Sequence, residues 1–340
     1  MSDITLSRQR RTGDLASAFR QKPFTPWIAI VVLALLATMP MFSNPYMVVL
    51  FITIFMYLTL CLSWNVFCGP ANYVSLGTAA FFGIGVYTSA MFKDLPLPMV
   101  MLMAGVLSFA LGLVVGTASL RIKGMYFAIF TFGLSEFLRQ TMIWYEVNIT
   151  GTVGRWLPLQ DTNTVFYYML GVFVVTMLFA VLLQRSRWGL ALRSIGEAED
   201  AAAHVGINVN MVKILTFAAT CFFMAIAGAV LATRWSYIDP DLAFSPMVTF
   251  FVVMMTLVGG FRSTIYGPLL GALILTVLSD TVLANFSNLT MLLFGVILIV
   301  VIFFLPNGLM SLIQRKKRPA KITESETVVK LAKSLSPDPK

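Results

Sequence analysis

The amino-acid sequence predicts an all-α polytopic membrane protein with about ten transmembrane helices and with both termini in the cytoplasm. Composition is the first reason: hydrophobic residues make up 58% of the chain, charged residues 11%, and the mean hydropathy is +0.85. No soluble core explains such a composition. The second reason is a series of apolar blocks long enough to cross a bilayer, and the third is that Lys and Arg concentrate on alternate connections between them.

The chain divides into a membrane region, residues 27–310, and two polar ends. Residues 1–26 form a basic cytoplasmic arm. The apolar block 27–42 follows this arm without a small-x-small cleavage site behind it, so we expect an uncleaved first membrane helix. Residues 311–340 are basic and rich in Ser, Thr, Glu, Lys and Pro, and we expect a disordered cytoplasmic tail.

Further apolar blocks follow the first one along the chain. A helix that crosses the bilayer needs about 20 residues. Blocks 78–92 and 247–261 are shorter than that, and we expect them to be broken, re-entrant or tilted. The full series is 46–68, 78–92, 97–120, 125–145, 164–183, 212–233, 247–261, 267–284 and 289–305.

The distribution of basic residues tests this series of blocks. With the N-terminus inside, 20 of the 24 Lys and Arg residues fall on inner segments, whereas Lys93, Arg155 and Arg234 fall outside and Arg139 lies within a helix. This bias agrees with the positive-inside rule and places the loop 184–213 in the cytoplasm. The net charge of +9 therefore comes mostly from basic residues on cytoplasmic segments, where anionic lipid attracts them. No nucleic-acid partner is expected.

The loop 184–213 is the one long polar run inside the membrane region. Its first part is basic, its middle is acidic, and the residues between Glu197 and Val205 are good helix formers. The acids stand early, where they favour a helix N-terminus, and Gly206 stands where a helix ends. We therefore expect a short surface helix that stops at this glycine.

The residues that most enzymes need are nearly absent. His204 is the single histidine, and the cysteines at 61, 68 and 221 all lie in apolar blocks, so neither a metal site nor a Ser-His-Asp arrangement can be assembled. No G-x-x-x-x-G-K-[ST] motif occurs either. We expect no cofactor in this chain and no enzymatic activity, so any ATP that energises it must be bound by another subunit.

Polar residues beside an interrupted helix mark a candidate translocation pathway. Gly69-Pro70 interrupts an apolar run, and polar side chains follow at membrane depth, as in carriers that build sites from broken helices. The alternative, a tight loop and a helix-packing face thinned by Gly77, Gly83 and Gly85, stays open. The candidate pathway residues are Asn72, Ser75, Thr78 and Tyr87.

Two further patterns concern helix packing and charge. Glu136 and Arg139 are three residues apart, so they share a helix face and can neutralise each other. This predicts a structural pair, although a role of Glu136 in translocation is the alternative. Glycines four residues apart, at 112 and 116 and at 267 and 271, predict faces where helices approach closely.

Four glycine-bearing stretches, residues 75–87, 120–136, 259–272 and 304–309, together with the loop 186–213 (SRWGLALRSIGEAEDAAAHVGINVNMVK), resemble the permease subunits of bacterial branched-chain amino-acid ABC importers, the LivM type. The resemblance runs from about Tyr46 to Leu309. It implies a ten-helix permease in the bacterial inner membrane that pairs with a second permease subunit. It also implies two cytoplasmic ATPase subunits, which bind the ATP, and a periplasmic solute-binding protein.

In that family the loop carries a coupling helix, which docks in a groove on the ATPase. The resemblance therefore implies that the ATPase contacts lie on a small set of loop residues: Arg193, Glu197, Asp200, Ala201, Ala202 and Gly206. A short helix with small residues on one face and charges at its rim suits such a groove.

The sequence departs from the family pattern near the pathway. The family often has His where Thr78 stands and Gly where Arg262 stands, and residues 150–154 match its glycine-rich turn loosely. Relatives transport branched-chain amino acids, urea, short amides or aromatic acids, and the substrate stays open among these. An ion-coupled secondary transporter of a small organic solute is the alternative function. Such carriers need acids within the membrane, and this chain offers only Glu136 and Asp280 there. The carrier function would also give the loop 184–213 no role.

Overall fold

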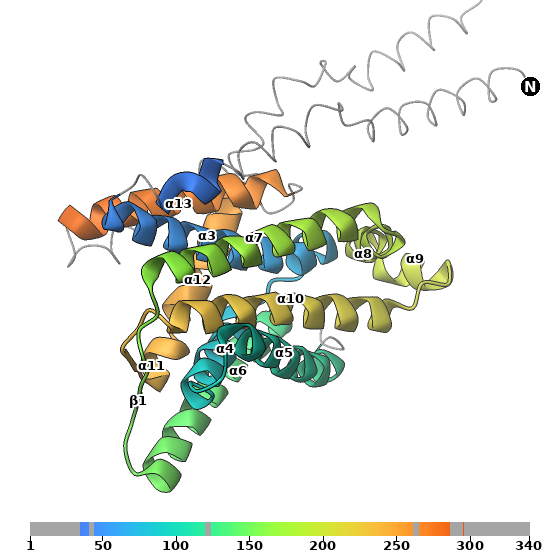
Figure 1. Ribbon diagram of the computed structural model, residues 1–340. Coiled ribbons are helices and arrows are strands. Elements are labelled where there is room, and N and C mark those ends of the chain that lie inside the picture. The colour runs from blue at the N-terminus through green and yellow to red at the C-terminus, as the bar shows by residue number, and fades with distance from the viewer. Residues whose placement is uncertain (1–34, 41–43, 120–123, 261–264, 286–294, 296–340) are drawn as a thin grey trace, which may run out of the picture. The chain divides into compact units, whose positions relative to one another are not determined.

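The computed structural model of the chain describes residues 35–40, 44–119, 124–260, 265–285 and 295 (Figure 1). Contacts between residues divide the chain into two compact units, Met1–Phe51 and Ile52–Lys340, and all contacts below lie within the second. The elements in chain order are α3 (Pro45–Ala71), α4 (Thr78–Met91), α5 (Leu97–Ser119), α6 (Met125–Tyr145), a π-helical turn (Glu146–Thr150), β1 (Arg155–Trp156), α7 (Thr162–Arg185), α8 (Arg187–Glu197), α9 (Glu199–His204), α10 (Val209–Ala232), β2 (Tyr237–Ile238), α11 (Pro240–Ala243), α12 (Pro246–Gly259) and α13 (Tyr266–Asn285).

The helices follow the expected apolar blocks to within a few residues. Among the described residues, five segments are long and apolar enough to cross a membrane: α3, α5, α7, α10 and the segment Pro240–Gly259 that joins α11 to α12. The helices α4 and α13 contribute shorter apolar stretches. The expected blocks 27–42 and 289–305 lie largely or wholly outside the described residues, as do both polar ends. The count of ten helices and the side of the termini therefore stay predictions.

The interruption expected at Gly69-Pro70 is displaced along the chain. Helix α3 continues through Pro70 and ends at Ala71, because a proline in the last turn of a helix removes only one backbone hydrogen bond. The break follows at residues 72–77, where Asn72 adopts a φ of +59°. Asparagine is one of the few side chains that tolerate this left-handed conformation.

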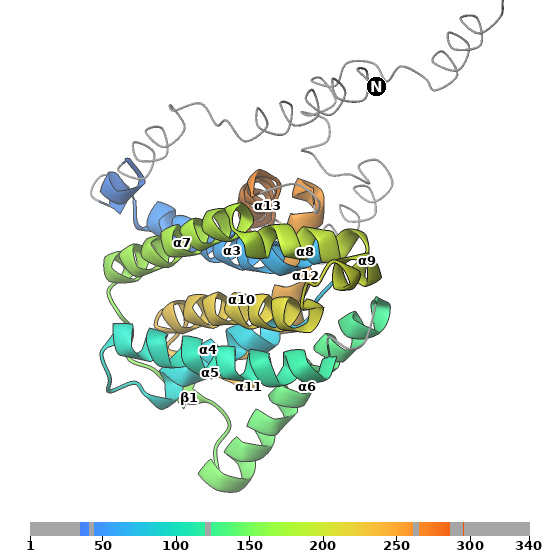
Figure 2. The same ribbon diagram turned by 90° about the vertical axis from the view of Figure 1, so that its right-hand side faces the viewer.

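Helix α10 lies between α3 and α7 on one side and α4 and α5 on the other (Figures 1 and 2). Its contact with α4 is close because glycines face backbone carbonyls: a Cβ atom on Gly85 would overlap the carbonyl of Ala225, and one on Gly228 would overlap the carbonyl of Phe82. Ser89 Oγ donates to the carbonyl of Ala229 at 2.9 Å. Small residues and hydroxyl hydrogen bonds of this kind hold helices together in lipid, where the hydrophobic effect does not.

The glycine pairs predicted as packing faces are packing faces. A Cβ atom on Gly112 would come within 3.0 Å of the Cα atom of Ala218 in α10, and one on Gly116 within 3.4 Å of Ile214. Helices α12 and α13 meet in the same way, since Gly259 lies against the carbonyl of Gly267 and Gly271 against that of Met255. The helix-packing role predicted for these glycine pairs is thus confirmed.

The two ends of α10 differ in what they carry. Helices α8 and α9 lie at its N-terminal end, and β1 lies near the opposite end (Figures 1 and 2). Strand β1 pairs antiparallel with β2, with Arg155 opposite Ile238 and Trp156 opposite Tyr237. This short pairing joins the connection between α6 and α7 to the connection between α10 and α11.

Candidate functional site

The loop 184–213 folds into two helices rather than one. Ser186 caps α8 by accepting a hydrogen bond from the Gly189 backbone at 3.4 Å, and α8 buries Gly189, Leu192 and Ile195 on one face. Buried residues three positions apart are typical of one face of a helix. The pattern was overlooked because the loop as a whole is polar. The end of α8 is pressed against the end of α3, since a Cβ atom on Gly196 would overlap the Pro70 carbonyl.

The expected short surface helix is α9. It spans Glu199–His204, follows the extended residue Ala198, and ends before Gly206, whose φ is +90°. The helix therefore stops at the predicted glycine, because few other residues adopt a positive φ without strain. Val205, beside it, is 83% exposed, so the end of α9 offers an accessible apolar side chain.

The residues proposed to contact an ATPase differ in exposure. Glu197, Asp200, Ala201 and Gly206 are exposed, and Arg193 is half-buried. Ala202 is only 4% exposed, so its side chain packs against the protein and is not available to a partner. The accessible members form a surface of charged and small residues around α9.

Helix α9 is tied to the membrane helices by a partly buried cluster of Tyr73, Glu199 and Lys213, which we call the latch. Lys213 Nζ donates to Glu199 Oε1 at 2.7 Å and to Tyr73 Oη at 2.9 Å, and Tyr73 Oη donates to Glu199 Oε2 at 3.2 Å. The ammonium also lies 4.6 Å from the centroid of the Tyr73 ring, within the range of a cation–π interaction. The Lys213 side chain is fully buried, so the latch compensates a charge that could not otherwise stay there.

The candidate pathway residues do not form one site. Asn72 is exposed in the break after α3. Ser75 is buried, and its carbonyl accepts a 2.8 Å hydrogen bond from Trp64 Nε1. Thr78 begins α4 at 1% exposure, and its hydroxyl has no hydrogen-bond partner among the described residues. Tyr87 lies toward the other end of α4, 2% exposed.

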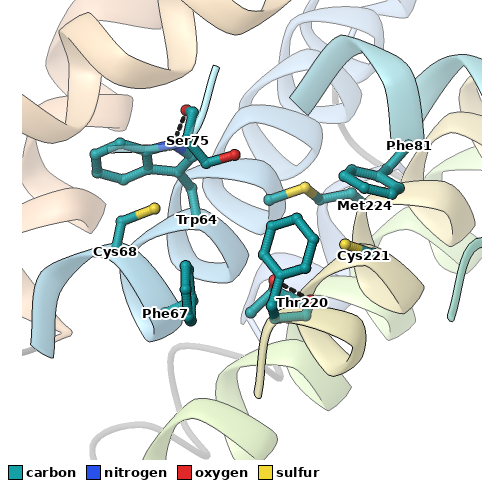
Figure 3. A pocket seen from close by; sticks show the side chains of 9 residues that line it. Trp64, Phe67, Cys68, Ser75, Phe81, Thr220, Cys221 and Met224 are labelled. Carbon is teal, nitrogen blue, oxygen red and sulfur yellow. Dashed lines mark hydrogen bonds between the residues drawn. The ribbon is translucent and has the colours of Figure 1, made fainter. Parts of the chain in front are cut away.

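Ser75 helps to line a small cavity between α3, α4 and α10 (Figure 3). About 10 Å³ of it is open to the centre of a water molecule, which is about the space that one water needs. The cavity is too small for an amino acid. Its other walls are mainly aromatic and sulfur-containing side chains: Trp64, Phe67, Phe81, Phe217, Cys68 and Cys221.

Tyr87 belongs to a second buried polar cluster, near the π-helical turn. Its hydroxyl lies 3.2 Å from Glu146 Oε1, and Glu146 Oε2 accepts a 2.8 Å hydrogen bond from the Gly154 backbone. Arg155 Nε lies 3.6 Å from Glu146 Oε1. Glu146 is fully buried, and it joins α4 to the connection that carries β1.

Glu136 and Arg139 form the ion pair that their spacing predicts. Arg139 Nη2 lies 2.7 Å from Glu136 Oε2, and Arg139 Nη1 lies 2.5 Å from Asp241 Oδ1. The two side chains of the pair are 27% and 31% exposed in the chain by itself. The bridge to Asp241 joins α6 to α11, which favours the structural role over translocation.

Sequence reasoning missed the partners of the buried charges. Glu199 and Lys213 stood in the loop as ordinary surface charges, and Glu146 stood at the end of an apolar block. One sequence feature could have pointed to these partners: Tyr73 and Tyr87 stand at the two ends of the glycine-rich stretch that leads into α4. A tyrosine at membrane depth needs a polar partner for its hydroxyl, and both Tyr73 and Tyr87 have a glutamate.

Comparison with known proteins identifies the family of this chain. A family model described as "Branched-chain amino acid transport system / permease component" matches residues 46–302. The chain is 25% identical to the high-affinity branched-chain amino acid transport system permease protein LivM of Escherichia coli (strain K12), over 75% of this chain and 68% of that protein.

Two other relatives match shorter parts of the chain. Identity is 30% to the high-affinity branched-chain amino acid transport system permease protein BraD of Pseudomonas aeruginosa, over 43% of this chain and 48% of that protein. It is 31% to the ribose import permease protein RbsC of Haemophilus influenzae, over 33% and 38%. No solved structure gives a significant match. With its family match over most of its length and its several apolar helices, this multi-pass membrane chain belongs to the family of branched-chain amino acid transport system permease components.

Proposed function

We propose that this chain is the membrane-spanning permease subunit of an ABC importer, which moves branched-chain or other small amino acids or amides inward. The observation that carries the proposal is α9, a short exposed helix at the end of the bundle whose Glu199 is bonded to the buried Lys213 of α10. A partner that pushes on α9 therefore acts directly on a helix of the membrane core. A carrier that works without a partner has no need of an exposed helix that is bonded to the membrane core in this way.

The chain works with separate subunits that supply the energy and the solute. Two cytoplasmic ATPase subunits bind and hydrolyse ATP, and a periplasmic solute-binding protein delivers the substrate. A second, similar permease subunit completes the pathway in the bacterial inner membrane. The family and the exposed surface around α9 support this proposed composition.

The ATPase contacts in this proposal lie on the accessible residues of the loop 184–213. Glu197 and Asp200 supply charge at the rim of α9, Ala201 supplies a face small enough to enter a groove, and Gly206 ends the helix. Arg193 supplies a cation on α8. Ala202 acts from within, by packing α9 against the protein.

Affinity purification followed by uptake measurements tests the function. The detergent-solubilised chain is expected to co-purify with an ATPase and a second permease, and uptake of radiolabelled leucine into cells should stop when ATP is depleted and the ion gradients are kept. Recovery of the chain alone, with gradient-driven uptake that ignores ATP, would instead establish the secondary transporter. The solute that the co-encoded binding protein retains on dialysis then identifies the substrate class.

A further inference from the structure

Helix α6 carries a row of exposed aromatic side chains along its length. Tyr126, Phe130, Phe137 and Trp144 are four or seven residues apart, so they lie on one face of the helix. We call these four side chains the α6 face. The part of α6 that leads to β1 runs clear of the other described helices (Figures 1 and 2). A large apolar surface of this kind is not left in contact with water.

The α6 face does not suit lipid either, because polar groups lie along its edge. Glu136 stands near the middle of the 21-residue helix, and its side chain and that of Arg139 are 31% and 27% exposed. Asp241, which also pairs with Arg139, is 69% exposed, and Gln140 is exposed one turn beyond Glu136. Charged groups at membrane depth face protein or water rather than hydrocarbon. In agreement, α6 is not among the five described segments that are apolar enough to cross a membrane.

The length of the α6 face indicates what kind of protein covers it. From Tyr126 to Trp144 the helix rises by about 27 Å, at about 1.5 Å per residue. The hydrocarbon core of a bilayer is about 30 Å thick. A partner that covers the whole face must therefore cross the membrane itself. Of the subunits proposed above, the ATPases and the solute-binding protein lie on either side of the membrane, which leaves the second permease.

The charges beside the α6 face favour a similar chain over another copy of this one. Two carboxylates, those of Glu136 and Asp241, share the single guanidinium of Arg139. A second copy would bring the same excess of negative charge to the interface. A different chain can place a basic or hydrogen-bond-donating side chain opposite Asp241, and complementary charges of this kind select the correct partner.

We propose that the α6 face is the surface on which the second, similar permease subunit packs. The aromatic side chains supply the contact area, and the ion pairs at the edge are then covered by protein instead of lipid. The proposal rests on the importer function above, which requires a second permease, and it adds where on this chain that subunit binds.

Photo-crosslinking in native membranes tests the proposal. The photoreactive amino acid p-benzoylphenylalanine replaces Phe137 in cells that also express the co-purifying subunits, and the products are identified by mass spectrometry. We expect a crosslink to the second permease. The control carries the same probe in place of Val175, an exposed apolar residue of α7 with no charged residue between Thr162 and Leu183. This probe should react with lipid.

Truncation of the same side chain measures what the contact contributes to binding. Phe137 is 66% exposed, so Phe137→Ala should leave the chain itself folded, whereas loss of an aromatic anchor weakens an interface. We expect at least about fivefold less of the second permease for the same amount of purified chain, which corresponds to about 1 kcal/mol. Leu178→Ala, at an exposed residue of α7, is the matched control and should keep the wild-type ratio.

A probe at Phe137 that links only to lipid, to an ATPase, to the binding protein or to a second copy of this chain would overturn the proposal. So would equal recovery of the second permease with the Phe137→Ala and Leu178→Ala chains. A failure of the importer function looks different, because the wild-type chain itself would then be recovered without a second permease. A wrong surface leaves the wild-type complex intact and shows only in the variants and probes.

Discussion

Substitution of Gly206 is the sharpest test of the coupling loop. The residue ends α9 with a φ of +90°, and no atom lies within 4 Å of the place where a Cβ atom would stand. The cost of a side chain there is therefore backbone strain and not a clash. Strain of this kind amounts to about 1–3 kcal/mol, and a β-branched residue is at the upper end.

The protein can relieve the strain of Gly206→Val only by re-orienting residues beside it, which moves the exposed end of α9 out of its docking position. If the whole strain falls on docking, affinity for the ATPase falls by about 5- to 150-fold. Gly206→Asn should fall between wild type and Gly206→Val, because asparagine tolerates a positive φ. The membrane helices should be unaffected, since a Cβ atom at Gly206 would meet none of them within 4 Å.

The assay is a titration of ATPase against the purified permease complex, with thermal unfolding of each variant alongside. Gly171→Val is the matched control: Gly171 is an exposed glycine in α7, also without an atom within 4 Å of its Cβ position, and its φ is not positive. The control should bind ATPase like the wild type. Equal ATPase affinity and equal uptake in the Gly206→Val and Gly171→Val chains would refute the assignment of α9 as the docking element.

Three other substitutions test the packing and the polar clusters. Gly85→Ala should lower the free energy of unfolding by about 1–3 kcal/mol, because its Cβ atom would overlap the Ala225 carbonyl. Thermal unfolding measures this change. The control Gly133→Ala, whose Cβ atom would meet no atom, should be neutral or stabilising. Glu146→Gln should cost about 1–3 kcal/mol by leaving its buried polar partners poorly matched, and proteolysis of the connection before β1 should speed up; an unchanged digestion rate would contradict the role given to Glu146. Thr78→Val should leave stability unchanged or slightly raised, since the hydroxyl has no partner among the described residues, and should raise the KM of uptake if that hydroxyl contacts the solute; an unchanged KM removes Thr78 from the pathway.

The membrane helices could be predicted well because lipid imposes one strong rule on every one of them. A segment that crosses the bilayer must be apolar over a set length, so α6 begins and ends where its block does, and α5 and α10 differ from theirs by at most three residues. The pair of Glu136 and Arg139 was equally accessible, because a spacing of three along a helix is local geometry.

Contacts between residues that are far apart in the sequence could not be predicted in this way. Lys213 and Tyr73 are 140 positions apart, and nothing in an apolar pattern states which helices become neighbours. Helix α8 was missed because its buried residues Leu192 and Ile195 lie in a loop whose overall composition is polar. The roles given to the exposed loop residues came from family resemblance, and they stay predictions that the Gly206 experiment addresses.

The close contact of α4 with α10 has a consequence for biosynthesis. Ser89 and its hydrogen-bond partner Ala229 are separated by 140 positions, and ribosomes add about 5–20 residues per second, so α4 waits roughly 7–28 seconds for its partner to be made. Throughout that interval a 14-residue helix, too short to cross the bilayer by itself, carries a glycine face that nothing covers. Nascent chains stalled before residue 209 should therefore be the form of this protein that depends most on membrane insertion factors and is most exposed to membrane proteases.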